Sequence, residues 1–511
     1  MTRRSQSKHS LRVLTAVAAA AGLWTHAPGA GASPLFDTLG PIGGNAGVQG
    51  VASGPGAAST YFNPAMLTEA QEELLLGYTV FSEQIGVTLD GRRGGNVPPL
   101  AGERDILGGD GLPLPNDSMP TQWLEEGCAA GTASGECPPP GLGARPRQRA
   151  GSSGKTRTYL AIGIVKHLVP RRFTLGAFAL LPVSSFTTVR GFYNDEREAL
   201  FSNSLHPELY GDRMTALSVA VGAGLELRRD LSIGASLGLA LSNAVRSSTY
   251  VRDTTDYDKL LLDNSVSTQV DVAPNVGVRW KPAGSVRIAG VLRPPSAFVL
   301  DTSVNATLPS GTESGTTRRE TYHYVPWRVG LGAEVDVLQR GDYTMSLVGS
   351  IGYSFWSTYE DRHGQRPSVY GSDMAWSDTL NAAAGVRHVY GRARGFVDLS
   401  VTPSPVPDQV GRSNYVDNDR VGLALGGDLE VAIAGARVRP GLSLFAQRLV
   451  PRYARKDDAR IRDELPDDAV LGSTRDPVPG ARGLQTNNPG WPGFASSGFL
   501  WGGTFTLSIP L

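Results

Sequence analysis

The residue types that carry most enzyme chemistry are scarce and widely spaced in this chain. The only cysteines, Cys128 and Cys137, lie nine positions apart in a stretch rich in glycine and proline. Two thiols without further ligands nearby do not make a metal site, so in an oxidising compartment we expect a local disulfide between them. The histidines that follow residue 32 have neither metal-ligand spacing nor a serine nucleophile motif beside them: His167, His206, His323, His363 and His388. We therefore expect no catalytic residues, no metal and no cofactor.

An oxidising compartment is indicated by the first 32 residues. Basic residues between positions 3 and 12 precede an apolar stretch at 13–24, and Ala30-Gly31-Ala32 offers a small-residue cleavage site. This order is typical of a secretory signal peptide. We predict a signal peptide over 1–32 and a mature chain that begins near Ser33.

Composition limits the partners and the fold class. The 511 residues include 48 basic and 48 acidic side chains, which leaves no net charge to attract nucleic acid. Charged residues make up 19% of the chain, and it contains 63 glycines and 35 prolines, a mixture that disfavours a helical protein. No apolar run long enough for a transmembrane helix follows the apolar stretch at 13–24. A membrane β-barrel stays open, because its lipid-facing residues alternate with polar ones.

From about Leu74 onward the sequence falls into segments whose apolar residues recur at every second position. In the stretch 231–242, for example, leucine, isoleucine and alanine at odd positions alternate with serine, glycine and alanine at even ones. The stretches 217–228, 325–337, 420–431 and 499–511 have the same period. A period of two indicates strands that present one face to each of two environments.

The connections between these segments distinguish a membrane barrel from a soluble sandwich. Short and long connections take turns along the chain. The short ones are 170–172, 229–230, 282–284, 339–342, 391–392 and 434–435, and the long ones are 90–154, 194–212, 252–265, 309–319, 361–373, 408–413 and 456–496. This alternation predicts an all-β fold, an antiparallel transmembrane barrel of about fourteen strands over residues 74–511. Short turns would face the periplasm and long loops the exterior of the bacterial outer membrane.

The segment 33–73, between the signal peptide and the first strand, is too long for a simple leader and too rich in small residues for a strand. It contains the small-residue run 43–60, followed by Tyr61, Phe62, Asn63, Pro64 and Ala65. A fourteen-stranded barrel is too wide to be filled by its own side chains, so an inserted segment is expected to close it. Asn before Pro favours a turn, because proline restricts the preceding residue to extended geometry.

This segment resembles the N-terminal hatch of the FadL family, outer-membrane channels for long-chain fatty acids and other hydrophobic molecules. The family's hatch has a small-residue stretch that ends in Asn-Pro-Ala, which Asn63, Pro64 and Ala65 match. The stretches 274–295 and 418–427 also look similar to the family. The resemblance implies a fourteen-stranded barrel with a lumenal hatch over 33–73, a hydrophobic small-molecule ligand, no cofactor, contact with outer-membrane lipids and a monomeric channel.

The resemblance also implies a route for the ligand. In the family, apolar loops capture the ligand, which passes to a lumenal site and leaves when the hatch moves or sideways through a gap at a kinked third strand. We count the third strand as 173–193, with Pro182 in its middle, so Pro182, Val183, Ser184 and Ser185 are the candidate lateral opening. Candidate capture residues form an apolar cluster in the second long loop: Leu200, Phe201, Leu205, Leu209 and Tyr210.

Several alternatives stay open. The longest loops, 90–154 and 456–496, are rich in glycine, proline and charge, so the ligand could be a fatty acid, an aromatic hydrocarbon or another amphipath. Lumenal Arg293 or Arg328 could pair with a ligand carboxylate or with carboxylates of the protein. The alternative functions are a general diffusion porin for polar solutes and a structural or adhesive outer-membrane protein.

Overall fold

The computed structural model describes thirteen stretches of the chain. These stretches are 34–43, 46–89, 150–170, 172–183, 217–251, 260–307, 313–360, 376–408, 415–433, 435–455, 470–471, 476–477 and 493–511. The predicted signal peptide and both cysteines lie outside the described residues. None of the helices in these stretches is long and apolar enough to cross a membrane.

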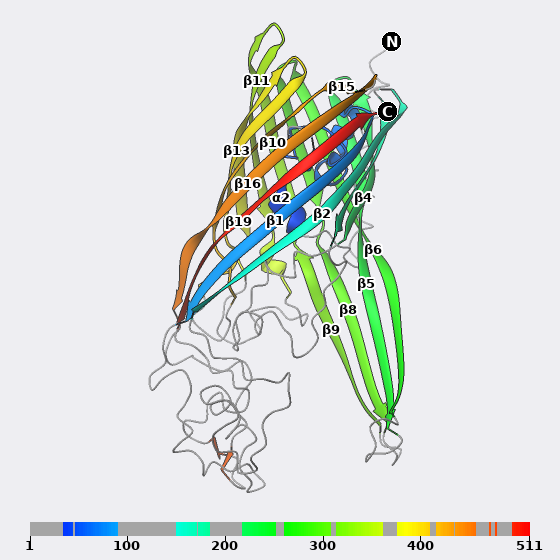
Figure 1. Cartoon of the computed structure of the whole chain (residues 1–511), viewed down its shortest axis with the longest axis vertical. Coiled ribbons are helices and arrows are strands. Elements are labelled where there is room, and N and C mark those ends of the chain that lie inside the picture. Colours follow the sequence, from blue (N-terminus) through cyan, green and yellow to red (C-terminus); the bar gives the residue numbers. More distant parts are fainter. Residues whose placement is uncertain are drawn as a thin grey trace, which may run out of the picture.

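The strands form a closed antiparallel barrel of fourteen strands, as the alternation of short and long connections predicts (Figure 1). The strands are β1 (Glu73–Leu89), β2 (Ala150–Val169), β3 (Phe173–Pro182), β4 (Ser218–Arg228), β5 (Leu231–Val251), β6 (Leu260–Ala283), β7 (Val286–Arg293), β8 (Ser296–Thr307), β9 (Glu313–Val325), β10 (Arg328–Arg340), β11 (Tyr343–Ser354), β12 (Thr379–Tyr390), β13 (Ala393–Thr402), β14 (Arg420–Leu429), β15 (Val431–Ile433), β16 (Ala436–Arg455) and β19 (Gly493–Pro510). Three barrel strands are interrupted, so β7 with β8, β9 with β10 and β14 with β15 each count once. A separate short pair consists of β17 (Val470–Leu471) and β18 (Asp476–Pro477).

The barrel closes where its first and last strands meet. β1 pairs with β19 along its whole length, from Glu73 opposite Pro510 to Leu89 opposite Phe494, and with β2 on its other side. Closure leaves neither terminal strand with an unpaired edge, which an open sheet of this size would expose.

Each of the six predicted short connections joins two strands that are neighbours in the barrel. Two of them are shorter than predicted, because β6 continues to Ala283 and β10 to Arg340, and positions 171 and 434 lie outside the described residues. Three of these turns contain a glycine with positive φ: Gly341 at 57°, Gly391 at 56° and Gly435 at 84°. Residues with a side chain rarely adopt this backbone conformation, so glycine allows the chain to reverse within two residues.

Four strands, β2, β6, β9 and β19, begin earlier in the chain than the sequence indicates. Residues 260–265 and 313–319 belong to β6 and β9, although we predicted them to be loop. The outer parts of β5, β6, β8 and β9 continue beyond the rest of the barrel as a projecting sheet, in which β5 pairs in parallel with β8 (Figure 1). The sequence of this sheet is rich in serine, threonine and asparagine, which also form loops, so polarity alone did not distinguish the two. The predicted loops 90–154 and 456–496 are likewise shorter, because β2 begins at Ala150 and β19 at Gly493.

The third strand differs from its predicted bounds. β3 runs from Phe173 to Pro182, and the predicted residues 184–193 lie outside the described residues. Pro182 is therefore the last residue of β3, where it lies opposite Tyr159 of β2. Val183 follows as a bend and is 51% exposed.

The outward face of the barrel is apolar and the inward face is small or polar. Large exposed side chains recur at every second residue of the strands, as with Leu423 and Leu425 of β14 and Leu442 and Leu444 of β16. Between them lie inward residues such as Ala424, which is buried. An outward apolar surface that continues from strand to strand is what a hydrocarbon environment favours.

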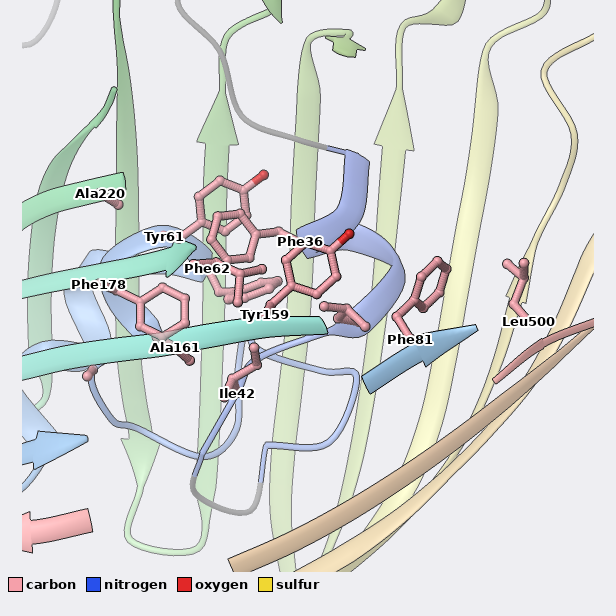
Figure 2. Packing of buried hydrophobic residues seen from close by; sticks show 14 of the residues in the cluster. Phe36, Ile42, Tyr61, Phe62, Phe81, Tyr159, Ala161, Phe178, Ala220 and Leu500 are labelled. Carbon is pink, nitrogen blue, oxygen red and sulfur yellow. The ribbon is translucent and has the colours of Figure 1, made fainter. Parts of the chain in front are cut away.

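The N-terminal segment, defined here as residues 34–70, lies inside the barrel (Figure 2). It contains α2 (Pro34–Leu39), α3 (Ser59–Phe62) and η1 (Pro64–Glu69), and η1 contacts β3, β4, β5 and β6. Its aromatic side chains form one cluster with the wall. Ring centroids are 4.4 Å apart for Phe36 and Tyr61, and 5.6 Å apart for Phe36 and Phe178 of β3. The segment is thus held by packing on the inner wall.

A charge placed on the outward face tests the membrane assignment. We expect Leu425→Arg, at mid-strand in β14, to destabilise the folded protein in bilayers by about 2–4 kcal/mol, the cost of arginine near the bilayer midplane. Ile433→Arg, beside the short turn after β15, should cost at most about 1 kcal/mol. Urea unfolding in phospholipid vesicles measures both values, and equal costs at the two sites would contradict the predicted bilayer position.

Candidate functional site

The candidate site is the lumen, where the N-terminal segment meets the barrel wall. Asn63 is fully buried at the centre of this contact and caps η1, because its side-chain oxygen accepts a hydrogen bond of 3.1 Å from the Ala65 amide. Its side-chain amide donates to the carbonyl of Val51 at 2.8 Å, within the segment, and to that of Val278 on β6 at 3.4 Å. One side chain therefore orders the turn and also contacts the wall.

The wall carries glycine where the Asn-Pro-Ala turn approaches it. A Cβ at Gly277 of β6 would lie 2.0 Å from the Asn63 side-chain oxygen, and one at Gly234 of β5 would lie 2.3 Å from the Ala65 nitrogen. Neither distance is compatible with a side chain. These glycines let the segment lie directly against the backbone of the strands.

A buried ion pair on the wall binds the first part of the segment. Arg387 of β12 and Asp398 of β13 are 1% and 0% exposed in their side chains, with their closest atoms 2.6 Å apart. The Asp398 carboxylate also accepts hydrogen bonds from the Val48 amide at 2.9 Å and from the Gln49 side chain at 3.0 Å. Arg387 donates to the Ser53 hydroxyl at 3.0 Å and to the carbonyl of Ala46.

Gly47 makes this contact with Asp398 sterically possible. Its φ is 60°, and a Cβ at this position would lie 1.9 Å from a carboxylate oxygen of Asp398. Both the backbone conformation and the space available therefore require glycine.

A second attachment joins the end of the segment to β6. Arg279 of β6 is buried and donates to the Glu69 carboxylate and, at 2.8 Å, to the carbonyl of Ala52. Lys281, also on β6, lies 3.0 Å from the same carboxylate. Burial raises the pKa of Glu69, but the two cations lower it by more, so the net shift is below its usual value.

A third attachment involves the two arginines that we considered as partners for a ligand carboxylate. Arg293 of β7 and Arg328 of β10 both pair with Asp37 of α2, at 3.1 Å and 2.6 Å. Burial raises the pKa of Asp37, but the guanidinium groups of Arg328 and Arg293 together lower it by more, so the net shift is below its usual value. Arg293 also lies over the Tyr61 ring, 4.9 Å from its centroid.

An aromatic cluster lies at the ends of the strands away from the short turns. Tyr359 and Trp376 stack with their ring centroids 3.8 Å apart, and Tyr415 meets Trp376 edge-on at 5.2 Å. Trp356 and Tyr324 pack against this cluster. Beside it, a cavity of about 60 Å³ separates these residues from α2, with Trp356, Asp37 and Arg328 among its lining residues.

The predicted site residues fall into two groups. The motif residues Tyr61, Phe62, Asn63, Pro64 and Ala65 are all buried in the N-terminal segment. Among the other candidates, Pro182 and Val183 are at the end of β3. The remaining candidates lie outside the described residues, so their assignments stay predictions: Ser184, Ser185, Leu200, Phe201, Leu205, Leu209, Tyr210, Cys128 and Cys137.

Sequence reasoning did not find four of the residues that join the segment to the wall. Asp37, Arg387, Asp398 and Gln447 each bond between wall and segment, and Gln447 donates to the carbonyl of Thr38 at 3.0 Å. A signal for one of them was present, since Asp398 is a single charge between the outward-facing Val397 and Leu399. A lone charge at an inward position of an apolar strand indicates a lumenal partner.

Comparison with known proteins identifies the fold. No protein-family model and no curated protein sequence matches the chain. A solved FadL homologue from Pseudomonas aeruginosa is similar over 94% of this chain and 98% of its own, with 12% identity and a TM-score of 0.51. The toluene transporter TodX of P. putida matches 93% of this chain and 99% of its own, with 10% identity and a TM-score of 0.46. TbuX of Ralstonia pickettii, also a toluene transporter, matches 94% and 99%, with 10% identity and a TM-score of 0.40. The first likeness shows that the chain has the fold of the FadL homologue.

The ion pair of Arg387 and Asp398 can be tested through the segment that it binds. Because Asp398 accepts the Val48 amide, we expect Asp398→Ala to speed hydrogen exchange at Val48 by about tenfold or more, since a hydrogen bond to a charged group contributes about 1.5–3 kcal/mol. Mass spectrometry of residues 46–53 in the folded protein measures the change. Asp428→Ala is the matched control, because Asp428 pairs with Arg394 between two wall strands. Equal exchange in the two variants would contradict this role for Asp398.

Proposed function

We propose that this chain is an outer-membrane channel of the FadL family that takes up hydrophobic molecules such as long-chain fatty acids or aromatic hydrocarbons. The observation that carries the proposal is the lumen, where the N-terminal segment is hydrogen-bonded to β6 through Asn63 and Arg279 and to β13 through Asp398. A barrel built for the free diffusion of polar solutes needs an open aqueous lumen. A lumen closed by a packed segment favours transport in which the ligand is first bound and then released. In this proposal each chain acts as a monomeric channel.

The proposed release is by movement of the N-terminal segment or sideways through the wall beside β3. Within the described residues, pairing between β3 and β4 extends only from Phe173 to Leu180, and residues 150–157 of β2 pair with β1 alone. The Val183 amide donates to Thr158 of β2, so the nitrogen of Pro182 points to the β4 side, where proline has no hydrogen to donate. A lateral exit suits an apolar ligand, because the bilayer is a better solvent for it than water.

The route begins, in this proposal, at the outer loops. The apolar residues Leu200, Phe201, Leu205, Leu209 and Tyr210 would capture the ligand before it enters the lumen. The aromatic cluster around Trp376 supports the next step, since flat, apolar side chains at the outer strand ends offer a contact surface for a hydrophobic molecule. Catalysis has no part in this function.

Ion conductance distinguishes a closed transporter from a porin. We expect the intact mature protein in planar bilayers to give no large steady current, because the N-terminal segment occupies the lumen. Deletion of residues 34–70 should produce large open-channel currents, provided that the variant still runs as a folded barrel on unheated gels. Large steady currents from the intact protein would favour the general diffusion porin.

The lateral route predicts a specific effect of the proline at the end of β3. Pro182→Val restores a backbone donor on the β4 side, so we expect it to favour continued pairing there and to slow uptake of a radiolabelled hydrocarbon or fatty acid severalfold. Binding to the detergent-solubilised protein should not change. The matched control is Pro440→Val, on β16 opposite Leu507 of β19 and away from β3. Uptake that is unchanged by Pro182→Val would leave release through the periplasmic end.

A further inference from the structure

The cavity between α2 and the outer strand ends has a polar side and an apolar side. The apolar side consists of Val325, Pro326, Trp356, Pro403 and Pro405. The polar side includes Arg328, Arg420, Asn381 and Gln447. Its volume of about 60 Å³ is several times what one water molecule needs, so the cavity can admit a polar head group of a few heavy atoms.

Arg420, at the start of β14, differs from the other lumenal arginines. The following arginines each pair with a carboxylate of the protein: Arg279, Arg287, Arg293, Arg328, Arg387, Arg394 and Arg439. The described residues provide neither an ion pair nor a hydrogen bond for the side chain of Arg420, and its Nε atom is buried without a partner. A guanidinium that is partly removed from water without a counter-ion costs free energy, so this position is suited to an anion.

The charge balance of this cavity and its neighbour points in the same direction. This cavity and its neighbour, which share Asp37, Arg328, Asn381 and Gln447, are lined by the guanidinium groups of Arg293, Arg328 and Arg420 and by the single carboxylate of Asp37. Asp37 is shared between Arg293 and Arg328, so both that group of three and Arg420 carry surplus positive charge, and only Arg420 is without a carboxylate partner among the described residues.

The apolar side of the cavity is held in place independently of Arg420. Arg452 of β16 donates to the Ser404 hydroxyl at 3.1 Å and to the carbonyl of Pro407 at 2.8 Å, which fixes the segment that carries Pro403 and Pro405. The Ser377 amide donates to the carbonyl of Pro405 at 2.7 Å and so connects this segment to the aromatic cluster. A preformed apolar wall beside an unpaired cation is complementary to a molecule with an apolar body and one negative charge.

We propose that this cavity binds the carboxylate of an apolar acid, with Arg420 as the residue that selects the acid over a neutral molecule of the same size. The inference rests on the proposed function and narrows its ligand class. The carboxylate receives charge-assisted hydrogen bonds from Arg420, with Arg328 close to it, and the apolar body lies along Trp356 and the two prolines. A neutral hydrocarbon or alcohol gains the apolar contacts and leaves Arg420 unpaired.

Two ligands with the same carbon chain test this selection. Isothermal titration calorimetry of the full-length mature protein in a non-ionic detergent, at pH 7.5, compares octanoate with octan-1-ol. We expect the wild type to prefer octanoate, and Arg420→Gln to weaken octanoate binding at least about tenfold, or about 1.4 kcal/mol, with less than a twofold effect on octan-1-ol. Arg420→Lys should keep the preference because it keeps the charge.

The matched control is Arg437→Gln, an exposed arginine beside the short turn before β16, which should change neither affinity. If Arg420→Gln keeps the wild-type ratio of the two affinities, the selective role of Arg420 is wrong while the channel function stands. If neither ligand binds the wild-type protein, both this inference and the proposed function are wrong. A folded-barrel gel shift for each variant excludes misfolding as the cause of a lost preference.

Discussion

The width of the barrel determines most of what the lumen must contain. Fourteen strands enclose more space than their own inward side chains can fill, so a closed barrel of this size needs an inserted segment. Inserting a chain without regular strand pairing buries backbone amides and carbonyls that have no ladder partner. The wall supplies those partners. Asp398 accepts the Val48 amide, Arg279 donates to the carbonyl of Ala52, and Gln447 donates to that of Thr38.

The same requirement explains why charges are buried in this lumen. A buried ion pair such as Arg387 with Asp398 gives little net stability, because both groups lose their hydration. Its carboxylate and guanidinium can nevertheless satisfy several backbone groups of the N-terminal segment at once, which apolar side chains cannot do. Charged attachments are also different in kind from apolar packing. They depend strongly on geometry, so a small displacement of the segment costs several hydrogen bonds together.

The sequence predicted the barrel better than it predicted the lumen. Alternation along each strand and the order of short and long connections gave the strand number, because both follow from local backbone geometry. The Asn-Pro-Ala motif lies buried at the start of η1, and its role in a hatch stays a prediction. Arg293 and Arg328 were expected to pair with a carboxylate of the ligand or of the protein, but Asp37 could not be named as that partner, since it is more than 250 positions away in the chain and only closure of the barrel brings the three residues together. The extended parts of β6 and β9 were missed for another reason, which is that polar strands and polar loops have similar compositions.

Arg328 connects the cavity to the N-terminal segment. It lines the cavity and pairs with Asp37 of α2, so an anion bound beside Arg420 acts on the same guanidinium as Asp37 does. A cation shared between two carboxylates attracts each of them less strongly than a cation paired with one. Coupling of this kind is reciprocal: whatever an anion in the cavity does to the attachment of α2, detachment of α2 does to the affinity for that anion. A neutral ligand in the same cavity has no such effect on Asp37. If the cavity binds an acid as proposed, the charge of the ligand, and not only its apolar body, decides whether the lumenal segment responds to its binding.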